Sequence, residues 1–209
     1  MTNRNRVKQI LKLLLSEYPD AGTMLEFSSN FELLVAVILS AQSTDMQVNR
    51  VTAELFKRNQ SPQDFAALSL IEIEDLIKGV GLHKTKAKNI KAMAELLIKE
   101  HGGQIPADLD ELIKLPGVGR KTANVMLAVG FNQPGLGVDT HVHRVANRLG
   151  LAASKNPDKT EKELKALIPR ELWSKSHHLF IWHGRKVCKA RKPRCEECVL
   201  EELCPKNCD

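Results

Sequence analysis

Residues 115–123, LPGVGRKTA, decide how the middle of this chain folds. Pro116 ends a helical pattern that precedes it, because proline has no backbone N–H for an intrahelical hydrogen bond. Two glycines follow and permit a tight turn in which the backbone can approach a ligand closely. A new helix then begins at Arg120 with backbone N–H groups pointing outward, which suits a phosphate. The stretch therefore predicts a phosphate-binding helix–turn–helix, although a plain turn between two helices is the alternative.

Lys121 lies in the first turn of the second helix of this motif. A neutral lysine amine is a nucleophile that can form a Schiff base with a sugar carbon. A lysine that only contacts phosphate is more common, so the residues by themselves leave both roles open. A nucleoside-triphosphate loop is excluded because the G-x-x-x-x-G-K-[ST] spacing is missing.

Working outward from this motif, apolar residues recur at helical spacing along the chain, and no alternating strand pattern occurs. Capping signals precede several of these segments: Thr44 with Gln47, Ser61 with Pro62 and Asp64, and Ser69 with Glu72. We therefore expect an all-α fold, with helices over residues 7–15, 31–39, 48–56, 85–100, 109–113, 120–130, 140–149, 159–168 and 171–184, and two more after Ser61 and Ser69.

Residues 77–87 resemble residues 113–123, since each is a helix end, a Gly-x-Gly turn and a basic helix start. Two such stretches indicate a repeated hairpin. Chance similarity at helix ends is the alternative.

Asp139 precedes the predicted helix 140–149 and suits its N-cap. The pattern Asp-x-His-x-His does not indicate a metal site here, because residues two apart on a helix point in nearly opposite directions and His141 cannot share one ion with His143. An acid at this position can also stabilise a developing positive charge or accept a proton.

Four cysteines cluster near the C-terminus, where their thiolates can hold zinc or an iron–sulfur cluster. Structural zinc sites usually have two closely spaced pairs, whereas this set has only one, which favours a [4Fe–4S] cluster. A basic run that includes Arg191 and Lys192 lies between the first two and can grip phosphate or simply be solvated. The set is Cys188, Cys195, Cys198 and Cys204, and Cys208 is left over.

The length of 209 residues allows one large domain or two small ones, and the net charge of +6 weakly indicates a polyanionic partner. The longest apolar run, Leu33 to Leu39, is far shorter than the ~20 residues that span a membrane. No secretion signal is recognisable, and an odd cysteine count fits a reducing compartment. We expect a cytoplasmic, nucleoid-associated monomer that does not bind membranes.

Several stretches together resemble the endonuclease III family of DNA base-excision glycosylases, in the family's order along nearly the whole chain. They are residues 39–45 (LSAQSTD), the hairpin 115–123, residues 138–141 (VDTH), residues 183–185 (HGR) and the four-cysteine spacing. The hairpin by itself is a general helix-hairpin-helix DNA-binding signal. The hairpin lysine, the later aspartate and the cysteine spacing together are far more specific.

The resemblance implies an all-α fold of two helical lobes with a DNA-binding cleft. One lobe would be a helical barrel over residues 22–132 with the helix-hairpin-helix motif. The other would combine residues 1–21 and 133–209 and carry a [4Fe–4S] cluster in loop 188–204. Lys121 and Asp139 match the family's catalytic residues. The matched DNA-binding residues are Gln42, Leu82, Gly117, Val118, Gly119, Arg120, His141, Arg191 and Lys192, of which Gln42 and Leu82 would enter the duplex.

The implied function is base-excision repair of double-stranded DNA that contains damaged bases or abasic sites. The enzyme would remove oxidised or ring-damaged pyrimidines and cleave the strand by β-elimination through a lysine Schiff base. A non-catalytic DNA-structure-binding module is the alternative of another class. A monofunctional adenine glycosylase is a second, although that group generally lacks the lysine, and a zinc-stabilised transcription factor is a third.

Overall fold

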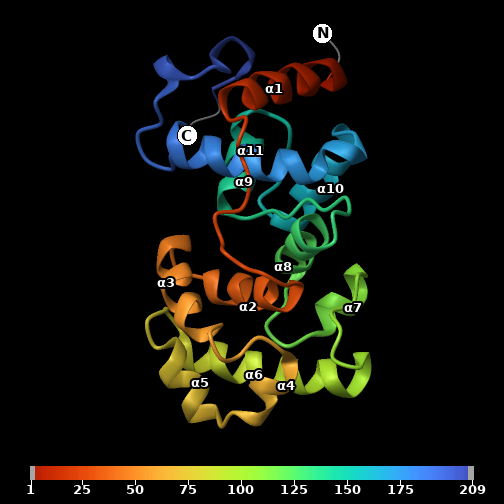
Figure 1. Cartoon of the computed structure of the whole chain (residues 1–209). Coiled ribbons are helices and arrows are strands. Elements are labelled where there is room, and N and C mark those ends of the chain that lie inside the picture. Colours follow the sequence, from red (N-terminus) through yellow and green to blue (C-terminus); the bar gives the residue numbers. More distant parts are fainter. Residues whose placement is uncertain (1–2, 207–209) are drawn as a thin grey trace. The chain divides into compact units, whose positions relative to one another are not determined.

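A computed structural model describes residues 3–206, and in this part of the chain all regular secondary structure is helical, without a strand (Figure 1). The chain forms two compact units. One is the continuous segment Met24–Asn132, and the other joins Met1–Thr23 to Gln133–Asp209. Each unit has its own hydrophobic core. The expectation of an all-α fold is confirmed.

The continuous unit contains seven α-helices and one π-helical turn. They are α2 (Asn30–Ser40), α3 (Asp45–Leu55), α4 (Pro62–Ala67), α5 (Leu70–Ile77), α6 (His83–His101), α7 (Leu109–Lys114), α8 (Arg120–Val125) and the π-helical turn η1 (Met126–Gly130). Helix α2 forms the centre of its core, because every residue from Phe31 to Leu39 is buried. A helix that is apolar on all sides is stable only inside a core, so the other helices must surround α2.

The second unit is built from both ends of the sequence. It contains α1 (Asn3–Glu17), α9 (Thr140–Arg148), α10 (Pro157–Leu167), α11 (Trp173–Lys186) and the 3₁₀ turns η2 (Arg170–Leu172), η3 (Cys195–Glu197) and η4 (Glu201–Leu203). Helix α1 packs against α10 and α11, which Figure 1 shows as a red helix beside blue ones. Its apolar stripe, Val7, Ile10, Leu11 and Leu14, is fully or almost fully buried in this core.

Two of the predicted helix starts are capping boxes, as the sequence indicates. Ser61 and Asp64 pair reciprocally at the start of α4, and Ser69 and Glu72 do the same at α5. The third box is wrong in part. Thr44 accepts a hydrogen bond from the Gln47 backbone N–H, but the Gln47 side chain donates to the Gly79 carbonyl instead of returning to Thr44.

The helix predicted over residues 120–130 changes character in the middle. It is α-helical to Val125 and continues as the wider turn η1, in which the Phe131 N–H bonds to the Met126 carbonyl. All residues from Ala123 to Leu127 are buried. Five consecutive buried positions exceed what one face of a regular helix presents.

The Ser61 cap gives a test of this unit's stability. Replacing Ser61 by Ala removes the bond that the Asp64 N–H donates and should lower the free energy of unfolding by about 1 kcal/mol. The Ser61 hydroxyl is also the largest cause that lowers the pKa of Asp64. A folded pKa below the unfolded pKa adds stability at pH values above the unfolded pKa, and this stability is lost as the pH falls. The part of the difference between wild type and S61A that comes from the Asp64 charge should therefore disappear in acid, whereas the part that comes from the Asp64 N–H bond should remain.

Urea unfolding followed by circular dichroism at neutral and acidic pH measures this difference. Ser61→Thr, which keeps the capping hydroxyl, is the control and should behave as wild type. Equal unfolding midpoints for S61A and wild type at neutral pH would contradict the role of this cap.

Candidate functional site

The turn between α7 and α8 has the geometry that its glycines predict. Gly117 has a left-handed backbone with φ of 81°, and the Val118 N–H closes the turn on the Leu115 carbonyl at 3.0 Å. Val118 is buried and anchors the turn in the core, whereas Gly117 and Gly119 are exposed. The buried Val118 side chain therefore fixes the turn to the core, while the backbone at Gly117 and Gly119 stays accessible to solvent.

The two glycines of the turn are needed for different reasons. A Cβ on Gly117 would lie 2.9 Å from the Cβ of Asn89 on α6, so a side chain there would clash as well as strain the backbone. A Cβ on Gly119 would have no protein atom within 4 Å. Packing within the chain does not require a glycine at 119, so the open space beside it is available to a ligand.

Helix α8 starts at this open position without a side-chain cap. Gly119 is its N-cap residue, and the Ala123 N–H makes a first-turn bond to the Gly119 carbonyl at 2.9 Å. Arg120 and Lys121 are both half-buried in the first turn. Positive side chains beside the positive end of a helix form an environment that attracts phosphate.

Asp139 caps α9, as its position predicts. Its Oδ1 accepts hydrogen bonds from the backbone N–H groups of His141 and Val142, both at 2.8 Å. Both bonds use the same oxygen, which fixes the plane of the carboxylate. Burial lowers the pKa of His141, although Asp139 partly opposes the shift, so the His141 ring is neutral at neutral pH. Its Nδ1 lies 3.1 Å from Arg144 Nη2.

The other end of α9 holds the start of the cysteine loop. Arg144 donates from Nε to the Cys188 carbonyl at 3.0 Å and from Nη2 to the Gly184 carbonyl at 2.9 Å. Arg148 donates to the Lys189 and Ala190 carbonyls at 2.6 and 3.1 Å, and to the Cys188 sulfur at 3.6 Å. Helix α9 therefore orients Asp139, its N-cap residue, at one end and the cysteine loop at its last turns.

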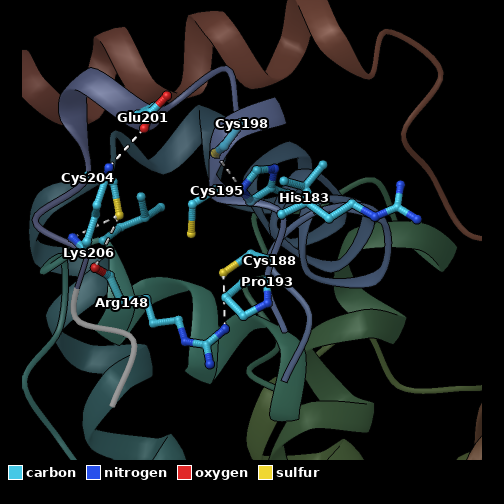
Figure 2. Close-up of a pocket in the computed structure, with 12 residues that line it drawn as sticks. Arg148, His183, Cys188, Pro193, Cys195, Cys198, Glu201, Cys204 and Lys206 are labelled. Atoms are coloured by element: carbon cyan, nitrogen blue, oxygen red, sulfur yellow. Dashed lines mark hydrogen bonds and ion pairs between the residues drawn. The ribbon is translucent and has the colours of Figure 1, made fainter. Parts of the chain in front are cut away.

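The four predicted metal ligands surround a single cavity. Cys188, Cys195, Cys198 and Cys204 line it, and Figure 2 shows their sulfurs pointing into a common space. Burial raises the pKa of Cys198 and Cys204, and the neighbouring cysteines raise both further. Four converging thiolates need a positively charged group between them, which an iron–sulfur cluster supplies. The donor set thus fits such a cluster. Cys208 lies outside the described residues.

His183 is a buried neighbour of this cavity. Its Nε2 lies 3.6 Å from the Cys198 sulfur (Figure 2). Its Nδ1 lies 3.3 Å from the Tyr18 hydroxyl. Burial lowers the pKa of His183 to about 4, so the ring is neutral at physiological pH. Tyr18 lies in the segment after α1, so His183 contacts both the N-terminal part of the chain and the cysteine loop.

Gln42 and Leu82 share an uncommon backbone conformation. Both have left-handed backbones, with φ of 55° and 57°, and both side chains are exposed. Gln42 lies in the loop between α2 and α3, and Leu82 in the loop between α5 and α6. Left-handed non-glycine residues are concentrated at functional sites. Arg191 and Lys192, on the cysteine loop, are also exposed.

The structure brings the four predicted metal ligands together and assigns the two predicted catalytic residues to different units. The four cysteines share one cavity. Lys121 belongs to the unit Met24–Asn132, whereas Asp139 belongs to the other unit. Arg148 and His183 are neighbours of the cysteines that were not predicted from the sequence. The one sequence signal for these two residues is that each is a polar residue within an otherwise apolar helical pattern.

Comparisons with known proteins agree with these features. Residues 35–170 match the model of the HhH-GPD superfamily of base excision DNA repair proteins, and residues 188–204 match the iron–sulfur binding domain of endonuclease III. Endonuclease III of Bacillus subtilis (strain 168) is 47% identical over 205 residues, which covers 98% of this chain and 94% of the relative. Endonuclease III of Escherichia coli (strain K12) is 44% identical over 202 residues, with 97% and 96% covered.

Solved structures give the same result. A trapped covalent intermediate of endonuclease III with DNA superposes with a TM-score of 0.94 at 44% identity, covering 99% of this chain and 97% of that one. A thermostable thymine-DNA glycosylase has the same fold, with a TM-score of 0.85 at 23% identity, covering 97% of this chain and 96% of the other. The hairpin, the capped aspartate, the cysteine cavity and these full-length similarities together establish that the chain belongs to the endonuclease III family of base excision DNA repair proteins.

Proposed function

We propose that this protein removes oxidised or ring-damaged pyrimidines from double-stranded DNA and then cleaves the strand at the abasic site, with Lys121 as the nucleophile and Asp139 as the essential carboxylate. Family membership makes the protein a base excision repair glycosylase and abasic-site lyase. The observation that supports Lys121 as the nucleophile is its position. It lies in the first turn of α8, directly after a hairpin that has open space beside Gly119.

The hairpin would hold a DNA phosphate through its backbone. Gly117 and Gly119 offer N–H groups on a turn that Val118 fixes in place through its buried side chain and through its N–H bond to the Leu115 carbonyl, and Arg120 adds positive charge. His141 would contact the DNA from the first turn of α9. A base inside the helical stack cannot be reached, so the damaged nucleotide must leave the duplex. Gln42 and Leu82 would occupy the vacated space.

The chemistry needs one amine for both steps. The Lys121 amine attacks the sugar C1′, and the damaged base departs with the bonding electron pair and takes up a proton. Loss of the amine proton and opening of the sugar ring give an iminium ion between Lys121 and C1′. The iminium acidifies the C2′ proton, whose loss drives β-elimination and breaks the C3′–O bond. Water then hydrolyses the imine and frees Lys121. Because the same amine serves both steps, the glycosylase and lyase activities are coupled.

Asp139 would stabilise the positive charge that develops on the sugar as the base leaves. The cap on α9 orients its carboxylate before substrate binds, so little reorganisation is required during the reaction. The cluster, when bound by the four cysteines, would supply structural cross-links, and base removal would need no redox step from it. This chain's own Arg191 and Lys192 would then lie on a loop of fixed shape and contact phosphates.

The relatives named above are bacterial enzymes, and we infer that this protein acts on chromosomal DNA in the bacterial cytoplasm, at the nucleoid. In the described part of the chain no helix is long and apolar enough to cross a bilayer.

Lys121→Ala should abolish covalent trapping. Borohydride reduces the Schiff base, so wild type incubated with a duplex that contains an abasic site should give a stable protein–DNA adduct, and K121A should give none. Lys114→Ala is the matched control, because Lys114 is exposed on α7 and forms an ion pair with Glu111 on the same helix. An adduct of equal yield from K121A, or none from wild type, would refute the mechanism. The second result is what a non-catalytic DNA-binding module predicts.

Asp139→Asn should separate catalysis from helix capping. Asparagine caps a helix about as well as aspartate, so the thermal unfolding midpoint should stay close to that of wild type. Loss of the negative charge should reduce base release about 10²–10³-fold, as removal of a preorganised electrostatic group does in other enzymes. Single-turnover base release measures the change, with Asp158→Asn, at an exposed position on α10, as the control. Base release at the wild-type rate would exclude Asp139 from catalysis.

Cys198→Ala should remove the cluster. Wild-type protein should be yellow-brown and contain about four irons and four inorganic sulfides per chain. C198A should lose most of this iron, and its loop 188–204 should become sensitive to protease. Cys208→Ser, at the cysteine outside the motif, should retain the iron. Colourless wild-type protein with stoichiometric zinc would be incompatible with the assignment.

A further inference from the structure

Lys86 is a buried lysine on α6 that the proposed chemistry does not use. Only 4% of its surface is exposed, and burial lowers its pKa. Its Nζ donates hydrogen bonds to the Leu39 carbonyl at 2.8 Å and to the Ser43 hydroxyl oxygen at 3.2 Å. A lysine is rarely buried unless its amine is paired, so these two contacts explain why it is tolerated in the core.

The first contact of Lys86 supports the end of α2. The Leu39 carbonyl belongs to the last turn of this helix, where carbonyl groups lack partners within the helix. A positive amine at a helix C-terminus also interacts favourably with the helix dipole. Lys86 therefore fixes the point from which the loop of residues 41–44 starts.

The second contact joins this loop to the loop of residues 78–82. The Ser43 hydroxyl oxygen that Lys86 approaches also accepts a hydrogen bond from the Gly81 N–H at 3.2 Å. The Gln47 side chain adds a bond to the Gly79 carbonyl. The backbones are so close that a Cβ on Gly81 would lie 3.2 Å from the Gln42 carbonyl oxygen. The two loops thus meet at one polar contact point, with Lys86 beneath it.

The residues beside this contact point are Gln42 and Leu82. Gln42 directly precedes Ser43, and Leu82 directly follows Gly81. Both have left-handed backbones although neither is glycine, and Leu82 is 55% exposed despite its apolar side chain. Such strained conformations persist only where the surrounding structure holds them. Polar bonds between the loops supply that constraint here.

We propose that Lys86 is a positioning residue that, through Ser43, holds Gln42 and Leu82 as one preorganised pair for entry into duplex DNA. This inference rests on the proposed function. Two short loops that moved independently would have to be ordered each time the duplex is opened. Ordering them in the free protein removes that entropic cost from the binding step.

Lys86→Met tests the proposal, because it removes the amine but keeps an unbranched side chain for the core. The readout is borohydride trapping on two substrates, a duplex and a single strand, each with one abasic site. A single strand offers no duplex to enter, so its reaction depends on Lys121 but not on the pair. K86M should react about tenfold more slowly than wild type with the duplex and at the wild-type rate with the single strand. Lys99→Met, at the exposed far end of α6, is the control.

A double-mutant cycle with Leu82→Ala shows whether Lys86 acts through the pair. If it does, K86M combined with L82A should slow the duplex reaction less than the product of the two separate effects. Multiplicative effects would show that Lys86 acts independently of Leu82 and would overturn the proposal. An equal loss on both substrates would also overturn it, because a general structural defect affects Lys121 as well.

Ser43→Ala keeps the test decisive if K86M does not fold. It removes the shared hydroxyl but leaves the lysine, and it should show the same duplex-selective loss, whereas Ser43→Thr should retain the wild-type rates. Wild-type rates on the duplex for S43A would overturn the proposal. Failure of the proposed function is distinguishable, because wild-type protein would then give no adduct with either substrate.

Discussion

The backbone at a helix end carries N–H or C=O groups that have no hydrogen-bond partner within the helix. This constraint determines where the residues that are proposed to act on DNA lie in this protein. The fold is made of short helices, so it has many such ends. At α8 the end is left open beside Gly119, and at α9 Asp139 closes it. At α2 the Leu39 carbonyl is closed by a buried lysine. The groups proposed to bind or transform DNA therefore lie where the helices require external partners.

The sequence predicts those parts of the structure that depend on local interactions. Helical periodicity and caps such as Ser61 and Ser69 concern residues a few positions apart, and they are confirmed. The spacing of the four cysteines likewise defines a ligand set before any fold is known, and the cavity contains all four. The roles of Lys121 and Asp139 came from a family resemblance, because spacing alone cannot relate two residues that far apart in sequence.

Contacts between distant segments could not be predicted in the same way. Gln47 has the spacing of a capping box, yet its side chain bonds to the Gly79 carbonyl, because the loop of residues 78–82 approaches the start of α3. Lys86 occurs in a basic run that looks like a solvated helix start, and only the packing of α6 against α2 reveals that it is buried. Arg148 similarly contacts carbonyls some 40 positions away.

The joining of both chain ends in one unit has a consequence for biosynthesis. The segment Met24–Asn132 carries its whole core in one continuous stretch, so it can collapse while the ribosome is still adding later residues. Helix α1 is made before this segment, but the apolar stripe of α1 can pack only after α10 and α11 have been made. Helix α1 therefore stays unpacked while the entire other unit is synthesised. The cysteine loop follows α11 in the chain, so iron and sulfide can be delivered to it only after all the α-helices of both units have been made.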